Sequence, residues 1–195
     1  MSYGIYIGKN LTSDGHAWLA GYGDEPSSHW LEIIPKKNKT GQKITVGVTE
    51  NAEMPGNLIK IPQASKTYKD IRVSYSCYLG VPAPITNGGL NEYGVAVRDV
   101  WSASRKELIN MTPKNQTGPN YSDLAKIVLE RAKSAREAVT IVSNLIKRYG
   151  ESSYGGNSHI FADSKEAWIM IQLSLIHISE PTRRTPISYA VFCLK

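Results

Sequence analysis

The sequence predicts an α+β fold in which two helices pack on an antiparallel β-sheet. Three observations support this prediction: short β-rich runs fill the first hundred residues, two segments of helical periodicity follow between 122 and 149, and a hairpin pattern closes the region at 158–171. Strands on both sides of a helical pair are typical of helices that cover one sheet. The regular β–α–β alternation of a doubly wound fold is missing, as are a P-loop, a G-x-G-x-x-G motif and Cys/His metal spacing.

The first strand is expected at residues 3–7, where aromatic and β-branched residues favour β-structure and Gly8 ends the run. The dipeptide Asp14-Gly15 is a hairpin turn signal, so residues 17–20 should form a second strand antiparallel to the first. Further strands are expected at residues 30–35, 44–48, 71–75 and 95–101, and a final hairpin at 158–162 and 167–171.

The two helices are expected to cover the sheet rather than to perform chemistry. Ser122 is predicted to cap the first helix, and Ser134 with Glu137 has the pattern of a capping box at the start of the second. Gly150 should end the second helix. Apolar residues at helical spacing predict the packed faces, which are Leu124, Ile127 and Val128 in the first helix and Ala138, Val142, Leu145 and Tyr149 in the second.

The final segment, residues 173–195, reads as a translated sequencing-library adapter. Residues 173–183 follow the codons of a transposase adapter, and residues 187–194 follow those of a flow-cell primer. We therefore treat residues 1–172 as the native part of a longer chain and exclude the tail from fold reasoning. Beyond Gln172 the chain is expected to leave the sheet or to lie on it loosely, and apolar residues of an incomplete sheet should be exposed.

Composition excludes several classes of function. The tail adds two positive charges, so residues 1–172 account for +4 of the formal net charge of +6, and no dense Lys/Arg block suggests nucleic acid as a partner. No apolar run approaches the roughly 18 residues of a membrane span, and residues from Ser2 onward are patterned as a strand rather than a signal peptide, so a cytoplasmic protein is expected. Cys77, the only cysteine before the tail, is expected to be a small buried residue.

Ser2 is the first candidate functional residue. A start methionine followed by a small residue is normally removed, which would give Ser2 a free α-amine as well as its hydroxyl. Such an amine has an unperturbed pKa of about 7.7–8.0, so it can accept the proton of the hydroxyl near neutral pH. One residue then supplies both nucleophile and base. The alternative is an ordinary N-terminal serine without a catalytic role.

Four segments carry a resemblance to a known family: residues 2–9, residues 14–24, Gly88-Gly-Leu-Asn-Glu-Tyr-Gly-Val95, and residues 123–168. Together they resemble the dipeptidase family of N-terminal nucleophile (Ntn) hydrolases, peptidase family C69 or U34, which is related to penicillin V acylase and bile salt hydrolase. The resemblance implies a four-layer αββα sandwich, of which this chain holds the N-terminal part. It also implies hydrolysis of a small peptide or amide substrate without a cofactor or metal.

Position by position, the resemblance makes Ser2 the nucleophile, Asp24 the carboxylate that holds the free amine, and Asn91 the donor to the oxyanion. Three further residues are expected to bind substrate: His29, Asn157 and His159. The alternatives are turn-forming roles for Asp24 and Asn91 and structural roles for the two histidines.

Two departures from the family leave the function open. Ser2 stands where most members have cysteine, and a hydroxyl is far less acidic than a thiol. Gly21 stands where an arginine is usual, three residues before Asp24, so one cationic contact is missing. The leading interpretation is a dipeptidase that is inactive in this truncated form. The alternatives are an acylase of non-peptide amides and a non-catalytic scaffold with the same fold.

Overall fold

The structure is a computed structural model that describes residues 2–25, 27–101, 114–152, 156–173 and 176–181. Its centre is a seven-stranded sheet in which every neighbouring pair is antiparallel. The strands are β3 (His29–Ile34), β8 (Asp70–Tyr75), β9 (Ile85–Asn91), β10 (Ala96–Trp101), β11 (Gly156–Ala162), β12 (Ala167–Leu173) and β13 (Ile176–Pro181). Their spatial order is β13-β12-β11-β10-β9-β8-β3. The α+β prediction is confirmed.

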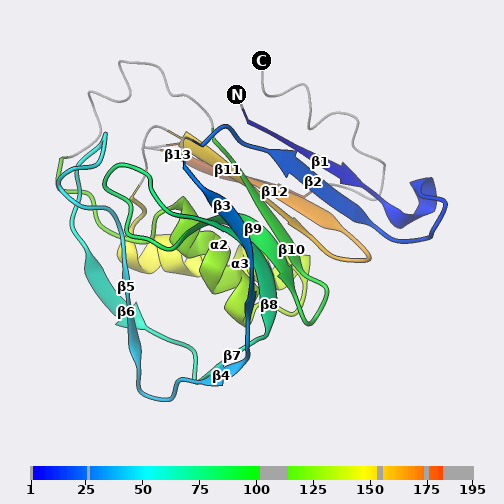
Figure 1. The fold of residues 1–195 in the computed structure, drawn as a ribbon, viewed down its shortest axis with the longest axis horizontal. Helices are drawn as coiled ribbons and strands as arrows, with labels where there is room; N and C mark the ends of the chain where they lie inside the picture. Colours follow the sequence, from blue (N-terminus) through cyan, green and yellow to red (C-terminus); the bar gives the residue numbers. More distant parts are fainter. Residues whose placement is uncertain (1, 26, 102–113, 153–155, 174–175, 182–195) are drawn as a thin grey trace.

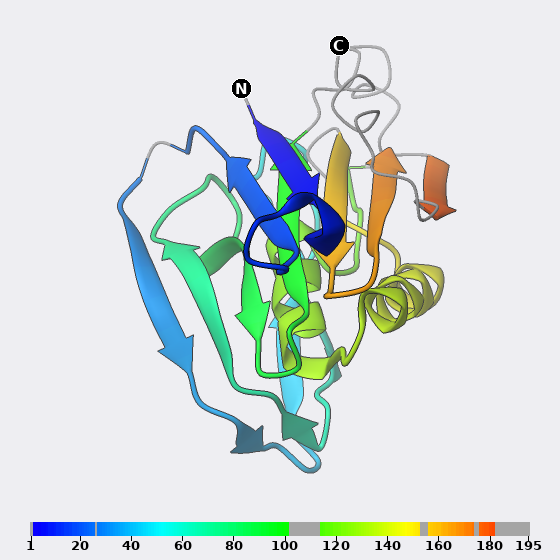
Figure 2. The same ribbon diagram turned by 90° about the vertical axis from the view of Figure 1, so that its right-hand side faces the viewer.

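Two layers flank this sheet (Figures 1 and 2). Helices α2 (Tyr121–Arg131) and α3 (Ala135–Tyr149) cover one face, where α2 packs mainly on β9 and β10. The opposite face carries a hairpin of β1 (Tyr3–Ile7) and β2 (Trp18–Tyr22), which lies over β10. Shorter ladders join β4 (Lys37–Asn38) to β7 (Lys66–Thr67) and β5 (Lys43–Val46) to β6 (Ile59–Pro62).

The first hairpin forms as its turn residues predict. Its connection contains a short 3-10 helix, η1 (Lys9–Leu11), and then the dipeptide Asp14-Gly15. Gly15 has φ +70°, a conformation that glycine adopts without steric cost. The Asp14 carboxylate accepts hydrogen bonds from the His16 amide at 3.0 Å and the Trp18 indole at 3.2 Å. These contacts stabilise the connection, so the prediction of a hairpin here is confirmed.

The cap of helix α2 is Asn120, two residues before the predicted cap. The Asn120 side chain accepts a hydrogen bond from the Asp123 amide at 3.0 Å, and the Asp123 carboxylate accepts one from the Asn120 amide at 3.2 Å. This reciprocal pair satisfies two backbone donors of the first turn. Ser122 lies inside the helix, where its hydroxyl accepts from the Thr86 amide at 2.9 Å. The prediction that Ser122 caps the helix is therefore wrong.

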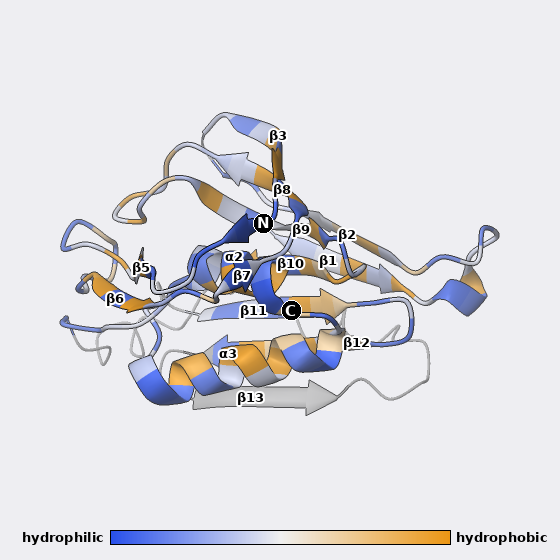
Figure 3. Ribbon diagram, turned by 90° about the horizontal axis from the view of Figure 1, so that it is seen from below, coloured by the Kyte–Doolittle hydropathy of each residue, from blue (hydrophilic) through white to orange (hydrophobic). Residues whose placement is uncertain are grey.

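Helix α3 follows its predicted boundaries. The Ser134 hydroxyl accepts from the Glu137 amide at 3.1 Å, while the Glu137 carboxylate accepts from the amide of Lys133 at 2.8 Å. Gly150 ends the helix with φ +80°. Apolar and polar bands alternate along the helix in Figure 3, and the buried residues are Ala135, Ala138, Val142 and Leu145. The helix therefore packs on the sheet through the expected apolar face.

The main core lies between the helices and the sheet. Residues Leu124, Ile127 and Val128 of α2 and Val142 of α3 are almost fully buried. They pack with sheet residues that include Val95, Val97, Phe161 and Met170. Each large apolar side chain buried in this way contributes about 1.5–3 kcal/mol to folding. The same packing fixes which side chains of β10 face the helices and which face the hairpin.

An apolar strip lies exposed on the hairpin side of the sheet. Leu31 of β3 pairs with Val73 of β8, and their exposed fractions are 67% and 40%. Two residues further along β3, Ile33 pairs with Ile71 of β8, and Ile71 pairs with Leu90 of β9. The exposed fractions of Ile33 and Leu90 are 66% and 46%. Exposed patches of this kind usually lie against a partner. The prediction of exposed apolar residues on this sheet is confirmed.

The backbone beyond Gln172 stays in the sheet. Strand β12 extends to Leu173, and β13 pairs with it from Leu173↔Ile176 to Trp168↔Pro181. Of the two predicted outcomes, leaving the sheet is therefore wrong for Ile176–Pro181, whereas loose side-chain packing of this segment stays a prediction. Without β13, β12 would be an edge strand with unpaired backbone donors and acceptors. Such an edge can pair with any neighbouring segment, because backbone pairing does not require a particular sequence. Residues 182–195 lie outside the described part of the chain.

Three further properties follow from the described residues. Cys77 is exposed with a free thiol, so the prediction that it is buried is wrong. In the described ranges, no helix is both long enough and apolar enough to cross a membrane. The predicted pairing of the final hairpin is confirmed, because Ile160 lies opposite Ile169.

Candidate active site at the start of the first strand

Ser2 lies at the open end of the β1–β2 hairpin. The last paired residues of the two strands are Tyr3 and Tyr22, whose rings stack with centroids 5.6 Å apart. Ser2 and Gly23 are the next residues on the two strands, so they lie beside each other just beyond this pair. Ser2 is half-buried. Ser2 is therefore held at a strand end, next to the loop that carries Asp24 and Glu25.

Glycines allow the hairpin backbone to lie directly on the sheet. A Cβ atom at Gly4 would collide with Ile160 and approach Val100 to 3.2 Å. A Cβ at Gly21 would collide with the side chain of Arg98. Because neither glycine has a side chain, β1 rests on β10 and β11, and β2 rests on Arg98. Ser2 is thereby placed near the Trp101 end of β10.

Glu25 is the acidic residue that points toward this strand end. A Cβ atom at Gly23 would collide with Oε1 of Glu25. The amide of Asn87 donates a hydrogen bond to the same oxygen, and Nε2 of His29 lies 3.5 Å from Oε2. His29 also stacks on Tyr75 with ring centroids 5.3 Å apart. Of the predicted substrate-binding residues, His29 thus lies in the group of residues near Ser2.

Asp24 lies near Ser2 across the open end of the hairpin, but its side chain faces solvent. It directly follows Gly23 and is exposed. Within the described part of the chain, its carboxylate makes no hydrogen bond or ion pair. Its neighbour Glu25 is more buried and is oriented by Asn87 and His29. The structure therefore offers two carboxylates near Ser2, of which Glu25 is the positioned one.

Asn91 lies at the other end of the sheet and has a structural role there. Its amide nitrogen donates to the carbonyls of Leu129 at 3.0 Å and Ala132 at 2.7 Å. Its side-chain oxygen accepts from the amides of Tyr93 and Val95, both at 3.0 Å. Both amide protons are therefore used by backbone carbonyls. The turn-forming alternative describes this residue better than the predicted role of oxyanion donor.

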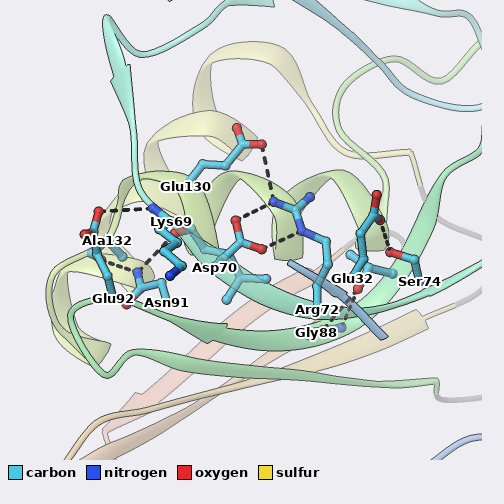
Figure 4. A network of polar contacts seen from close by, with 12 residues as sticks. Glu32, Lys69, Asp70, Arg72, Ser74, Gly88, Asn91, Glu92, Glu130 and Ala132 are labelled. Carbon is cyan, nitrogen blue, oxygen red and sulfur yellow. Dashed lines mark hydrogen bonds and ion pairs between the residues drawn. The ribbon is translucent and has the colours of Figure 1, made fainter. Parts of the chain in front are cut away.

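The position of Asn91 supports this conclusion. In Figure 4 it lies in a polar network with Lys69, Glu92 and Ala132, next to the Asp70–Arg72 ion pair of 2.6 Å. Asn91 is the last residue of β9, next to Leu90, which pairs with Ala96 at the start of β10. Gly4 of β1 instead rests on Val100, near the other end of β10. At about 3.3 Å per residue these two places are roughly 15 Å apart along the strand. The structure therefore does not bring Asn91 to Ser2.

Asn157 and His159 lie on the helix side of the sheet. His159 is fully buried, and its ring nitrogens lie 2.7 Å from Gln172 Oε1 and 3.0 Å from the Tyr121 carbonyl of α2. Asn157 is 2% exposed and lies 3.3 Å from the same ring. Burial lowers the pKa of His159, which favours the neutral imidazole. His159 therefore packs against α2 and Asn157 lies beside it, on the face of the sheet opposite the hairpin, which fits a structural role.

Alternation along β10 separates two charged residues. Arg98 faces the hairpin, whereas Asp99 is 3% exposed on the opposite face, near Tyr121. Burial raises the pKa of Asp99 to about 7, opposed by the positive charge of Arg98 and assisted by the negative charge of Glu25. Asp99 is therefore largely neutral in weakly acidic solution, and Arg98 is the member of this pair that lies on the hairpin face.

Sequence reasoning missed three of the residues that meet beneath Gly23, namely Glu25, Asn87 and Arg98. A signal for Arg98 was available, because alternation along residues 95–101 puts it on the face opposite Val97. Nothing in the sequence indicated that this face would meet Gly21 and Gly23. In the described ranges, no group of three or more His, Cys, Asp and Glu side chains is placed to hold a metal ion. The arrangement offers a hydroxyl, a carboxylate, an amide and a guanidinium.

Residues 4–177 match the family described as peptidase family C69. The chain belongs to peptidase family C69. This match covers all of the strands and helices described above, except that β1 and β13 are covered only in part.

Curated relatives of this C69 chain are dipeptidases by name. It is 27% identical over 182 residues to a protein described as probable dipeptidase B from Streptococcus pyogenes serotype M3, which covers 88% of this chain and 33% of the relative. It is 33% identical over 81 residues to probable dipeptidase B from Lactococcus lactis subsp. lactis, covering 41% of this chain and 17% of the relative. The chain thus spans about a third of the S. pyogenes protein.

Solved structures show that the C69 chain has part of the Ntn-hydrolase fold. Penicillin V acylase from Agrobacterium tumefaciens superposes with a TM-score of 0.54 at 16% identity, covering 95% of this chain and 51% of that one. A mutant of conjugated bile acid hydrolase from Clostridium perfringens gives a TM-score of 0.55 at 14% identity, covering 94% and 51%. The fold class is confirmed, and the described residues supply its helical layer, one sheet and a hairpin on the sheet's other face.

Proposed function

We propose that this chain is part of an amidohydrolase of the dipeptidase type, with Ser2 as nucleophile after removal of Met1. One observation carries the proposal: Ser2 directly precedes β1 and lies beside Gly23, and both Glu25 and Arg98 lie beneath Gly23. Membership of peptidase family C69 and the names of the curated relatives support it. The substrate is a small peptide with an amide bond near its free end.

In the proposed reaction, the Ser2 amine takes the proton of the Ser2 hydroxyl as the oxygen attacks the scissile carbonyl. The protonated amine then donates that proton to the leaving nitrogen, and the C–N bond breaks. An ester between Ser2 and the acyl group remains. Water, deprotonated by the same amine, hydrolyses this ester and restores the free hydroxyl.

Two side chains near Ser2 are assigned supporting roles. Glu25 orients the amine, because it is the carboxylate already held by Asn87 and His29; the exposed Asp24 is the alternative that the family resemblance favours. Asn87 has a second amide proton beyond the one given to Glu25, and this proton would stabilise the oxyanion. Loss of such a donor typically lowers the rate by about 10²–10³. Asn91 is not included, because its amide protons are already used.

A second candidate function is an acylase of non-peptide amides. It is favoured by the penicillin V acylase and conjugated bile acid hydrolase among the structural neighbours. Both candidates use the same nucleophile, so only the substrate distinguishes them. A non-catalytic scaffold is the third interpretation, since Ser2 is a weaker nucleophile than cysteine.

The test is a hydrolysis assay with two protein forms and two substrate sets. The protein translated from the uninterrupted reading frame past the codon for Gln172 should cleave dipeptides, whereas the 195-residue chain should be inactive because Leu31 and Ile33 remain exposed on its sheet. A parallel set of acyl amides distinguishes dipeptidase from acylase. Ser2→Ala should abolish either activity. Cleavage that survives Ser2→Ala, or no cleavage of any substrate by the longer protein, would disprove the proposal.

A further inference from the structure

Arg98 places a cation beside the proposed nucleophile. Its side chain runs beneath Gly21, where a Cβ would lie 2.7 Å from Cδ of Arg98. Its Nη2 atom ends 2.9 Å from the Cβ position of Gly23, the residue beside Ser2. Arg98 is half-buried and lies on the hairpin face of β10. The guanidinium is therefore held next to the proposed reacting end of the hairpin, on a residue that is only partly buried.

This guanidinium has unused hydrogen-bonding capacity. Its Nε is buried without a hydrogen-bond partner, and within the described ranges no carboxylate forms an ion pair with it. The nearby Glu25 carboxylate is instead bonded by Asn87 and approached by His29. A partly buried charge without a partner is costly to folding. Such a residue is expected where a ligand supplies the missing partner.

The chemistry of the side chain indicates the ligand. A guanidinium presents a planar set of donors that binds a carboxylate through two parallel hydrogen bonds. In a dipeptide, the terminal carboxylate is only three bonds from the carbon of the scissile carbonyl. A carbonyl placed at Ser2 therefore brings the carboxylate within reach of a group beside Gly23. A longer peptide has an uncharged amide carbonyl at this place.

We propose that Arg98 is a specificity-determining residue that binds the free C-terminal carboxylate of a dipeptide substrate. The inference rests on the proposed function, because it takes Ser2 as the attacking group. It assigns a reason for selecting dipeptides over longer peptides and over C-terminal amides. It also explains why Gly21 and Gly23 lack side chains, since either Cβ would collide with or crowd the residues of this site.

Kinetics with matched substrates test this assignment in the protein translated from the uninterrupted reading frame. The unmodified enzyme should prefer a dipeptide over its C-terminal amide by kcat/KM. Arg98→Met should lower kcat/KM for the free acid by about 30- to 100-fold, the scale of a lost charge-assisted pair, with little change for the amide. Arg98→Lys should retain an intermediate preference. Equal losses on acid and amide would overturn the proposal.

Two glycine variants make the test independent of removing the charge. Gly21→Ala places a Cβ against the Arg98 side chain and should reduce the preference for the free acid. Gly8→Ala in the same hairpin is the control, because its Cβ would lie 4.0 Å from Tyr6 in ordinary contact. An unchanged preference in Gly21→Ala, with the protein folded by circular dichroism, would contradict the proposed position of Arg98.

Direct binding separates this inference from the hydrolase proposal. In a Ser2→Ala background, calorimetric titration should show that the protein binds the dipeptide about tenfold more tightly than it binds the C-terminal amide of the same dipeptide. Adding Arg98→Met should remove this difference. If the unmodified enzyme cleaves nothing but binding still depends on Arg98, the hydrolase proposal fails and the carboxylate site stands. If cleavage occurs and binding does not distinguish acid from amide, the carboxylate site fails and the hydrolase proposal stands.

Discussion

The side chain of Arg98 occupies the space that a side chain at Gly21 would fill. The family resemblance leads one to expect an arginine at position 21, on the second strand of the hairpin. In this protein the cation near that position comes from β10, in the sheet beneath. Arg98, which is distant from Gly21 in sequence but adjacent to it in space, thus places a cation where the second strand of the hairpin lacks one.

The first prediction concerns the nucleophile. Ser2→Cys should raise kcat in the protein translated from the uninterrupted reading frame, because a thiol is more acidic and its anion more nucleophilic. Intact mass spectrometry should show that Met1 has been removed and that the amine is unmodified. A retained Met1 or an acetyl group in an active preparation would contradict the proposed base.

The second prediction concerns Asn91. Asn91→Ala should lower the free energy of unfolding by about 1–3 kcal/mol, since it leaves buried backbone groups near Leu129 and Ala132 without partners. Urea denaturation measures this change. The kcat/KM per folded molecule should stay within a few-fold of the unmodified enzyme. A folded variant that loses about 10²-fold in rate would instead support the oxyanion role that the family resemblance implies.

The third prediction concerns Asn87. Asn87→Ala should lower kcat by about 10²–10³ if its free amide proton stabilises the oxyanion. Asn87→Asp keeps the size of the side chain but places a carboxylate against Glu25, so it should be at least as inactive. Thr86, the neighbouring residue, binds the Val73 carbonyl at 2.6 Å, and Thr86→Ser is the control that keeps this bond. Activity unaffected by Asn87→Ala would remove Asn87 from the mechanism.

The fourth prediction is a pH dependence of stability. Burial raises the pKa of Asp99 from 3.8 to about 7, so the folded state binds a proton more tightly than the unfolded state. The contribution of Asp99 to the free energy of unfolding is fully present below about pH 4. It decreases as the pH rises to about 7, by up to about 4 kcal/mol in total. Asp99→Asn should remove this decrease. Parallel curves of unfolding free energy against pH for the two proteins would contradict the prediction.

The fifth prediction concerns the terminal segment. We propose that residues 173–195 derive from an adapter, so that β13 joins the edge of β12 through backbone pairing without a selected interface. Deleting residues 173–195 should change the free energy of unfolding by less than about 2 kcal/mol, the scale of one well-buried core contact. A larger loss would show that the segment is integral to the fold.

Local chemistry made several features predictable. The hairpin turn at Gly15, the end of α3 at Gly150 and the pairing of Ile160 with Ile169 depend on residues close together in sequence. The start of α2 was missed although Asn120 and Asp123 have capping spacing, because Ser122 offers a competing cap. Cys77 was misjudged, since an apolar or aromatic neighbourhood in sequence does not determine exposure.

The sequence by itself determined the class of fold, the position of the two helices, the family resemblance and the place of Ser2 at the start of a strand. These follow from periodicity, turn chemistry and short motifs, which act over a few residues. Only the tertiary structure decided that Asn91 is a turn residue and that Glu25, Asn87 and Arg98 meet beneath Gly23. That meeting depends on where the hairpin lies across β10, and this is set by the packing of Gly4 and Gly21 on residues about eighty to a hundred and fifty positions away in the chain.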